Sequence, residues 1–268
     1  MGSFREATTL TELNEDEFGA VLDAEWSVGG RMHGGYLLAV LGRAACLRTE
    51  PEHPHVTAVS ASFLEPPDEG RAVVRVRLLR RGRTVSQVGA TLVQDGRPRV
   101  EAHLTLGRLD DAGPWWAGHE PVVLPAEQDC VLASVNAPGA DFPVPLMNVI
   151  EERIDPAHLA FAFGAPSRGG VIASWQRLAD GSDWDPLSLL VACDPVPPVS
   201  ADLGLPGWVP TIQLSAYVRR LPAPGPVRVR LTATDVGGDR MDEVAQVWDD
   251  KGRLVAQSTQ LVAVRLPA

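Results

Sequence analysis

The stretch WDPLSLLVACD at residues 184–194 decides the fold that we expect for this chain. Asp185 can cap a helix, Pro186 suits the first helical position, and Pro195 ends the predicted helix, which spans about 186–194. All but one of residues 187–193 are apolar or small, so this helix should be buried on nearly every side. Asp194 then falls at the partially negative end of the helix, where a carboxylate gains nothing locally. An acid in such a position suggests a chemical role.

An echo of this stretch lies about 150 residues earlier, at MHGGYLLAVLG, residues 32–42. It follows the same plan of a polar cap and an apolar helix, which predicts a second buried helix over about 33–47. Gly42 stands where Asp194 stands in the later copy. The chain therefore carries a duplicated helix of which only the later copy has kept the acid.

Strand patterns surround both helices in a similar order. Alternating or β-branched runs predict strands at 20–23 or 25–28, 56–64, 71–79, 84–94, 99–106, 148–154, 158–163, 171–178, 211–220, 227–235, 241–248 and 254–264. The Asp95-Gly96 pair is a hairpin signal between two of them. We therefore expect an α+β fold made of two tandem repeats, each a curved antiparallel sheet wrapped around a long buried helix.

The expected boundaries are 1–110 for the first repeat, 111–145 for a linker and 146–268 for the second repeat, which carries the acid. The linker is rich in proline, and its Trp115 and Trp116 are expected to pack over the surface.

Composition limits the classes of function. The chain has 268 residues and a net charge of -10, so neither nucleic acid nor a membrane is an expected partner. Three cysteines without metal-ligand spacing, and no apparent signal peptide, predict a reduced cytoplasmic protein. The histidines also lack ligand spacing, so we expect no metal and no redox cofactor.

Several short motifs, in order and spacing, resemble the double hotdog acyl-CoA thioesterases, near acyl-CoA thioesterase II. They are GRMHGGY at 30–36, SFLEP at 62–66, QDGR at 94–97, CD at 193–194, TIQLS at 211–215 and LVAQSTQ at 254–260. The resemblance covers the chain apart from about 107–145. It implies a double hotdog fold and hydrolysis of an acyl-CoA to a free acid and coenzyme A. It also implies a homodimer or a higher homo-oligomer.

The same resemblance implies a catalytic set of Asp194, Thr211 and Gln260, which hold the hydrolytic water. Some relatives carry an Asp-His pair just after the threonine, and this chain has Gln213-Leu214 there instead. Asp194 would act as the base, while the two neutral side chains would orient the water.

The substrate-binding residues expected are His33, Gly34, Gly35 and Tyr36. The thioester oxygen could rest on backbone N–H groups at a helix N-terminus, near Gly34-Gly35 or near Leu187-Ser188.

Other interpretations stay open at this stage. Asp194 could be only a helix stop, His33 could cap a helix instead of acting as a base, and the run 80–83 could be a solvated turn instead of a phosphate contact. Attack could be direct or could pass through an anhydride on Asp194. One rival function is an enoyl-CoA hydratase or dehydratase, which is disfavoured because no histidine lies near Asp194 in the sequence. The other is a non-catalytic acyl-CoA or lipid carrier module.

Overall fold

A computed structural model describes residues 3–136, 142–207 and 209–267. Its helices are α1 (Phe4–Ala7), α2 (Gly34–Thr49), α3 (Leu189–Ala192) and α4 (Ser200–Leu203), with short 3-10 turns η1 (Ala24–Trp26), η2 (Glu127–Asp129), η3 (Pro145–Asn148), η4 (Pro156–His158) and η5 (Ala160–Phe163). None of the described helices is long and apolar enough to cross a membrane.

The strands form one large antiparallel sheet and one small pair. They are β1 (Leu10–Asn14), β2 (Glu17–Leu22), β3 (Ser27–Val28), β4 (Arg31–Met32), β5 (His55–Phe63), β6 (Gly70–Arg81), β7 (Ser86–Gln94), β8 (Arg97–Gly107), β9 (Val131–Leu132), β10 (Ile150–Ile154), β11 (Val171–Leu178), β12 (Thr211–Val218), β13 (Val227–Gly237), β14 (Arg240–Trp248) and β15 (Leu254–Ala263). Only β3 and β4 lie outside the large sheet among the described residues.

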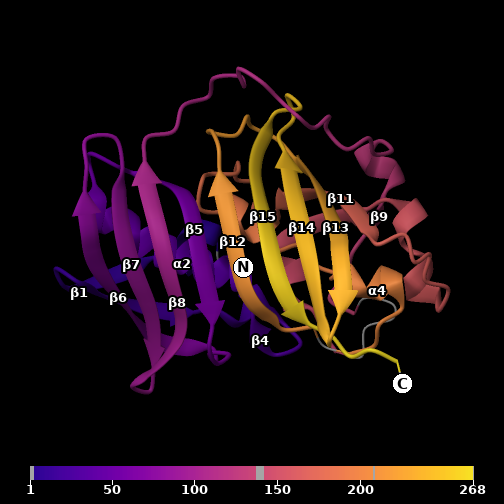
Figure 1. Cartoon of the computed structure of the whole chain (residues 1–268), viewed down its shortest axis with the longest axis horizontal. Helices are drawn as coiled ribbons and strands as arrows, with labels where there is room; N and C mark the ends of the chain where they lie inside the picture. The colour runs from indigo at the N-terminus through magenta and orange to yellow at the C-terminus, as the bar shows by residue number, and fades with distance from the viewer. Residues whose placement is uncertain (1–2, 137–141, 208, 268) are drawn as a thin grey trace.

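The strand order of the large sheet is β1-β2-β6-β7-β8-β5-β12-β15-β14-β13-β11-β10-β9. In each half, the strand that follows the helix lies at the centre, and the last strand of that half lies next to it. The two halves join where β5 pairs antiparallel with β12, and the Ser215 hydroxyl donates to the Ser60 hydroxyl at 2.9 Å there. Figure 1 shows the two groups of strands side by side, with the strands of the first half in purple and β12 to β15 of the second half in orange to yellow.

Helix α2 fills the inner side of the first half, behind β5 to β8 in Figure 1. Its first two turns are apolar on every side, and Tyr36, Leu38, Ala39 and Leu41 are fully buried, whereas Arg48 near its end forms surface ion pairs. A helix with this composition is stable only when it is covered all round, and the curved sheet and α3 provide that cover. The prediction of a buried helix over about 33–47 is therefore confirmed.

The second predicted helix is much shorter than expected. Only Leu189–Ala192 is α-helical, against a prediction of 186–194. The helix is shorter because much of the segment has 3-10 hydrogen bonds. The N–H groups of Leu190, Val191 and Asp194 each donate to the carbonyl three residues earlier. The predicted cap is present at the other end, where Asp185 Oδ1 accepts from the backbone N–H of Leu187 at 2.8 Å and of Ser188 at 2.7 Å.

Three further predictions meet a direct test. Asp95 and Gly96 both have positive φ, 52° and 74°, as a two-residue hairpin turn requires, so that prediction is confirmed. The predicted strand at 158–163 is wrong, because this segment forms the 3-10 turns η4 and η5. The expected packing of Trp115 and Trp116 is also wrong, since their exposed fractions are 102% and 75%.

Candidate active site

A cavity of about 1010 Å³ lies where the two halves meet. Its lining comes from β4 and the start of α2, from the segments 131–134 and 194–198, and from β12, β14 and β15. The predicted residues His33, Gly34, Asp194, Thr211 and Gln260 all line it. Residues that lie far apart in the sequence are thus brought to one space, and both halves contribute to it.

Asp194 directs its carboxylate at the N-terminus of α2. Its Oδ2 accepts a hydrogen bond from the Gly35 N–H at 2.9 Å, while only 12% of the side chain is exposed. The carboxylate therefore faces the partially positive end of one helix, although it follows the negative end of another. No bond to its Oδ1 occurs within the part of the chain that the structure describes. This oxygen is available to accept a proton.

His33 is the N-cap of α2, as one of the open interpretations required. Its Nδ1 accepts from the Tyr36 N–H at 3.3 Å, so the neutral ring carries its proton on Nε2. Nε2 lies 2.6 Å from the backbone oxygen of Asp194 and 3.4 Å from its Oδ2. The histidine therefore tethers Asp194 to the helix start. The absence of a histidine near Asp194 in the sequence was therefore misleading, because the fold brings His33 next to Asp194.

The Gly34-Gly35 pair lets α2 approach the segment around α3 very closely. A Cβ on Gly35 would lie 2.4 Å from the Leu190 carbonyl oxygen, and one on Gly34 would lie 2.7 Å from Asp194 Oδ2. The backbone contact requires glycine at position 35, and a side chain at position 34 would displace the Asp194 carboxylate from its place at the helix start.

One N–H at the start of α2 remains available to a ligand. The first four N–H groups of a helix have no partner within the helix. Here the His33 N–H donates to the Trp26 carbonyl, Gly35 donates to Asp194, and Tyr36 donates to the His33 ring. The Gly34 N–H makes no bond among the described residues, and Gly34 lines the cavity.

Tyr36 lies outside the cavity lining. It is fully buried, its ring stacks on Trp26 with centroids 5.3 Å apart, and its hydroxyl donates to the Ala7 carbonyl at 2.7 Å. Because residues two apart on a helix point in different directions, Tyr36 turns into the core of the first half.

Thr211 and Gln260 form a second polar group in the same cavity, on the neighbouring strands β12 and β15. The Thr211 hydroxyl donates to Gln260 Oε1 at 3.0 Å, and Gln260 Nε2 donates to Glu243 Oε2 at 2.8 Å. Glu243 Oε1 accepts from the Val199 N–H at 3.1 Å. The group is thus a chain of bonds that runs from a hydroxyl to a buried carboxylate.

Glu243 is the residue of this cavity that the sequence reasoning missed. It stands on β14 opposite Gln260, with an exposed fraction of 1%. Burial raises the pKa of its carboxyl to about 7, and the negative charge of Asp194 adds to the rise, while bonds from the Val199 N–H and Gln260 oppose it. The sequence did contain a signal for this residue, because Glu243 is an acid at an inward position of an alternating strand, between the inward residues Met241 and Ala245.

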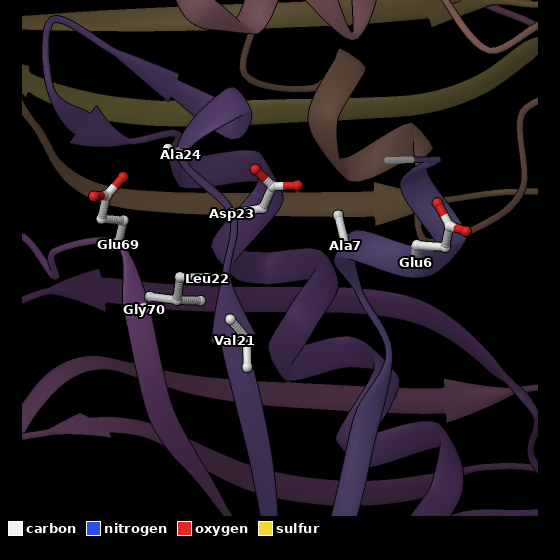
Figure 2. Close-up of a pocket in the computed structure, with 8 residues that line it drawn as sticks. All are labelled: Glu6, Ala7, Val21, Leu22, Asp23, Ala24, Glu69 and Gly70. Carbon is white, nitrogen blue, oxygen red and sulfur yellow. The ribbon is translucent and has the colours of Figure 1, made fainter. Parts of the chain in front are cut away.

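A smaller pocket of about 560 Å³ lies apart from these residues, in the first half of the chain. Figure 2 shows the carboxylates of Glu6, Asp23 and Glu69 spread around it. Its lining carries no cationic, hydroxyl or amide side chain, and an anionic substrate would be repelled there. The larger cavity is therefore the candidate active site.

The fold and the site together define a hotdog-type α+β protein with a largely apolar cavity between its halves, into which a few polar side chains are placed. The sequence model of the acyl-CoA thioesterase N-terminal domain matches residues 22–107, and that of the C-terminal domain matches residues 127–264. The chain therefore belongs to the acyl-CoA thioesterase family and is an enzyme of the thioester hydrolase class.

Individual relatives agree with this family. An uncharacterized protein of Mycobacterium tuberculosis (strain H37Rv) is 32% identical, and the match covers 97% of this chain and 98% of the relative. The solved structure of a candidate thioesterase II from Thermobifida fusca YX is 32% identical with a TM-score of 0.88, over 99% of this chain and 98% of the other. A hot dog fold protein of unknown function from Alicyclobacillus acidocaldarius is 22% identical with a TM-score of 0.86, over all of both chains, which shows the fold alone.

Proposed function

We propose that this protein hydrolyses an acyl-CoA thioester with water held by Asp194, Thr211 and Gln260. The observation that carries the proposal is that these side chains, which come from three separate elements, line one cavity beside the start of α2.

We further propose a double hotdog with repeats at 1–110 and 146–268 joined by 111–145. The mirrored strand order on the two sides of the β5 and β12 pair supports that division.

The thioester carbonyl would be polarised at the start of α2. Its oxygen would accept from the Gly34 N–H, which is free of protein partners among the described residues and lies at the positive end of a 16-residue helix. The negative charge that forms on this oxygen during attack would be stabilised there. This role assigns the substrate carbonyl to Gly34 and leaves the Gly35 N–H to orient Asp194.

Water would attack the carbonyl carbon directly. Asp194 Oδ1 would take one proton of the water, and Thr211 Oγ1 would accept its other O–H, because the Thr211 hydrogen is already committed to Gln260. The tetrahedral intermediate then collapses, the C–S bond breaks, and the coenzyme A thiolate takes the proton back from Asp194. Direct attack predicts that hydrolysis in isotopically labelled water leaves no label in Asp194, whereas an anhydride that water opens at the Asp194 carbonyl carbon would introduce it.

A hydratase or dehydratase has one observation in its favour, the closeness of His33 to Asp194. Such chemistry needs a histidine nitrogen that is free to move a proton. Both ring nitrogens are occupied here, one by the Tyr36 N–H and the other by the Asp194 carbonyl. The geometry therefore favours hydrolysis.

A thiol-release assay on a panel of acyl-CoA substrates tests the proposed function. The proposal predicts catalytic release of free coenzyme A. Saturable binding without release would instead identify a carrier module, and hydration of an enoyl-CoA without release would identify a hydratase.

Loss of either neutral side chain should slow the reaction. We expect Thr211→Ala and Gln260→Ala each to lower turnover roughly 10- to 1,000-fold, the scale of removing one positioning or stabilising group. Steady-state thiol release with circular dichroism of each variant checks this. Unchanged turnover in two folded variants would remove both residues from the site.

Arg31 is the candidate contact for the phosphates of coenzyme A. It is exposed, and it is the one Arg or Lys among the described residues of the cavity lining. An exposed ion pair contributes little, so Arg31→Ala should raise KM roughly 2- to 5-fold with turnover unchanged. Initial rates over a substrate range separate the two constants. Arg81, which pairs with Glu52 at 2.8 Å at the end of β6 and lies outside the cavity lining, provides the control, and Arg81→Ala should leave KM unaltered.

A cytoplasmic homo-oligomer remains our expectation, with acyl-CoA as substrate and neither nucleic acid nor membrane as partner. Light scattering in solution would measure the mass directly. A monomeric mass would contradict the oligomer and leave the catalytic proposal intact.

A further inference from the structure

The buried carboxyl of Glu243 is the one member of the polar chain that changes charge near neutral pH. Its neighbours fix what each of its oxygens can do. The Val199 N–H can only donate, so Oε1 must always accept. The carbonyl oxygen of a protonated carboxyl is a much better acceptor than its hydroxyl oxygen, so the proton is favoured on Oε2, the oxygen that faces the Gln260 amide at 2.8 Å.

We infer that Glu243 is a positioning residue whose ionised carboxylate fixes the orientation of the Gln260 amide, an inference that rests on the hydrolysis proposed above. When Glu243 is ionised, Gln260 must present its NH₂ group to Oε2, which turns the amide oxygen toward Thr211. The Thr211 hydroxyl then donates to that oxygen, as its 3.0 Å bond requires.

Protonation of Glu243 reverses this arrangement. An O–H on Oε2 would face the NH₂ of Gln260, donor against donor, so the amide must turn over and present its oxygen to Glu243. The NH₂ group then faces Thr211, whose hydroxyl must accept instead of donate. The Thr211 hydrogen would point at the attacking water and engage the lone pair needed for attack.

Few other groups can produce the same titration at this position. Strands β13 and β15 place Ala233 and Gln260 opposite Glu243, and the segment after Asp194 contributes the Val199 N–H. Asp194 is the charged group that acts on it among the described residues. With the pKa of Glu243 raised to about 7, the ionised and active arrangement dominates above that pH and is lost as the pH falls through it.

The pH profile of turnover tests this inference in four proteins. For the wild type we expect turnover to rise through one ionisation centred near pH 7. In Glu243→Gln the new amide must give its oxygen to Val199 and its NH₂ to Gln260, which imitates protonated Glu243 at every pH. Its turnover at about pH 8 should fall roughly 10-fold or more, and the inflection should vanish.

Glu152→Gln is the matched control. Glu152 is a second buried carboxyl of the same half, with its pKa also raised to about 7 by burial, but it is bonded by Ser174 and Gln176 and lies outside the cavity lining. This variant should keep the inflection of the wild type. Gln260→Met should lose both most of its turnover and the inflection, which keeps the test decisive if Glu243→Gln does not fold.

An inflection near pH 7 that persists in folded Glu243→Gln or in Gln260→Met would overturn the inference, as would a wild-type profile without that inflection. These outcomes are separate from a failure of the proposed function, which would appear as no release of coenzyme A by the wild type at any pH.

Discussion

Asp194→Asn should abolish most of the hydrolytic activity while leaving the fold intact. A general base typically contributes about 10²- to 10⁴-fold to rate, and we expect a turnover loss of that size. Asparagine can still accept from the Gly35 N–H through its amide oxygen, so the tether to α2 survives. What the variant loses is an oxygen able to take the proton of the attacking water. KM should change little, because substrate contacts at Gly34 remain.

Asp185→Asn is the matched control for this variant. It makes the same chemical change at the other end of the α3 segment, where Asp185 caps the backbone, and asparagine caps a helix about as well as aspartate. Thiol release and melting temperature should both stay near those of the wild type. If Asp194→Asn were as active as Asp185→Asn, Asp194 would be no more than a helix stop.

Gly35→Ala should impair both stability and activity. The added Cβ would lie 2.4 Å from the Leu190 carbonyl oxygen and 2.8 Å from the Val191 Cα, and backbone cannot move aside as a side chain can. Overpacking costs about 1–3 kcal/mol, which for a chain of this size corresponds to a fall in melting temperature of roughly 2–6 °C. Separation of the two segments would also pull Asp194 away from the Gly35 N–H, so turnover should fall as well.

Gly237→Ala adds the same methyl group in open space. No atom lies within 4 Å of that Cβ, and the residue has no positive φ that would strain alanine. Differential scanning calorimetry and thiol release should find this variant close to the wild type. A Gly35→Ala protein with wild-type melting temperature and turnover would contradict the close helix approach on which the position of Asp194 depends.

The sequence predicted the elements whose patterns are local. The apolar run after His33 and the alternating strands around it were recognisable because burial on all sides, or on one side, leaves a regular pattern. The helix before Asp194 was predicted too long, because its tight bonds to the carbonyls three residues earlier leave no trace in composition. The exposed tryptophans at 115 and 116 likewise follow no rule of local pattern.

The site was harder to predict because its contacts join residues far apart in the chain. His33 and Asp194 are 161 residues apart in sequence and yet adjacent in space. Motif order identified Asp194, Thr211 and Gln260 as candidates, but it could not indicate that Asp194 faces the start of α2. Glu243 was recognisable in principle as an acid at an inward strand position, a signal that has meaning only once its neighbour Gln260 is known.

A crystal structure of the Asp194→Asn variant with an intact acyl-CoA tests the central claim most directly. We predict that the thioester oxygen lies within hydrogen-bond distance of the Gly34 N–H, and that an ordered water bridges Asn at position 194 and the Thr211 hydroxyl, facing the carbonyl carbon. A thioester bound away from the start of α2, or a carbonyl carbon out of reach of any water held by Thr211 and Gln260, would contradict the account.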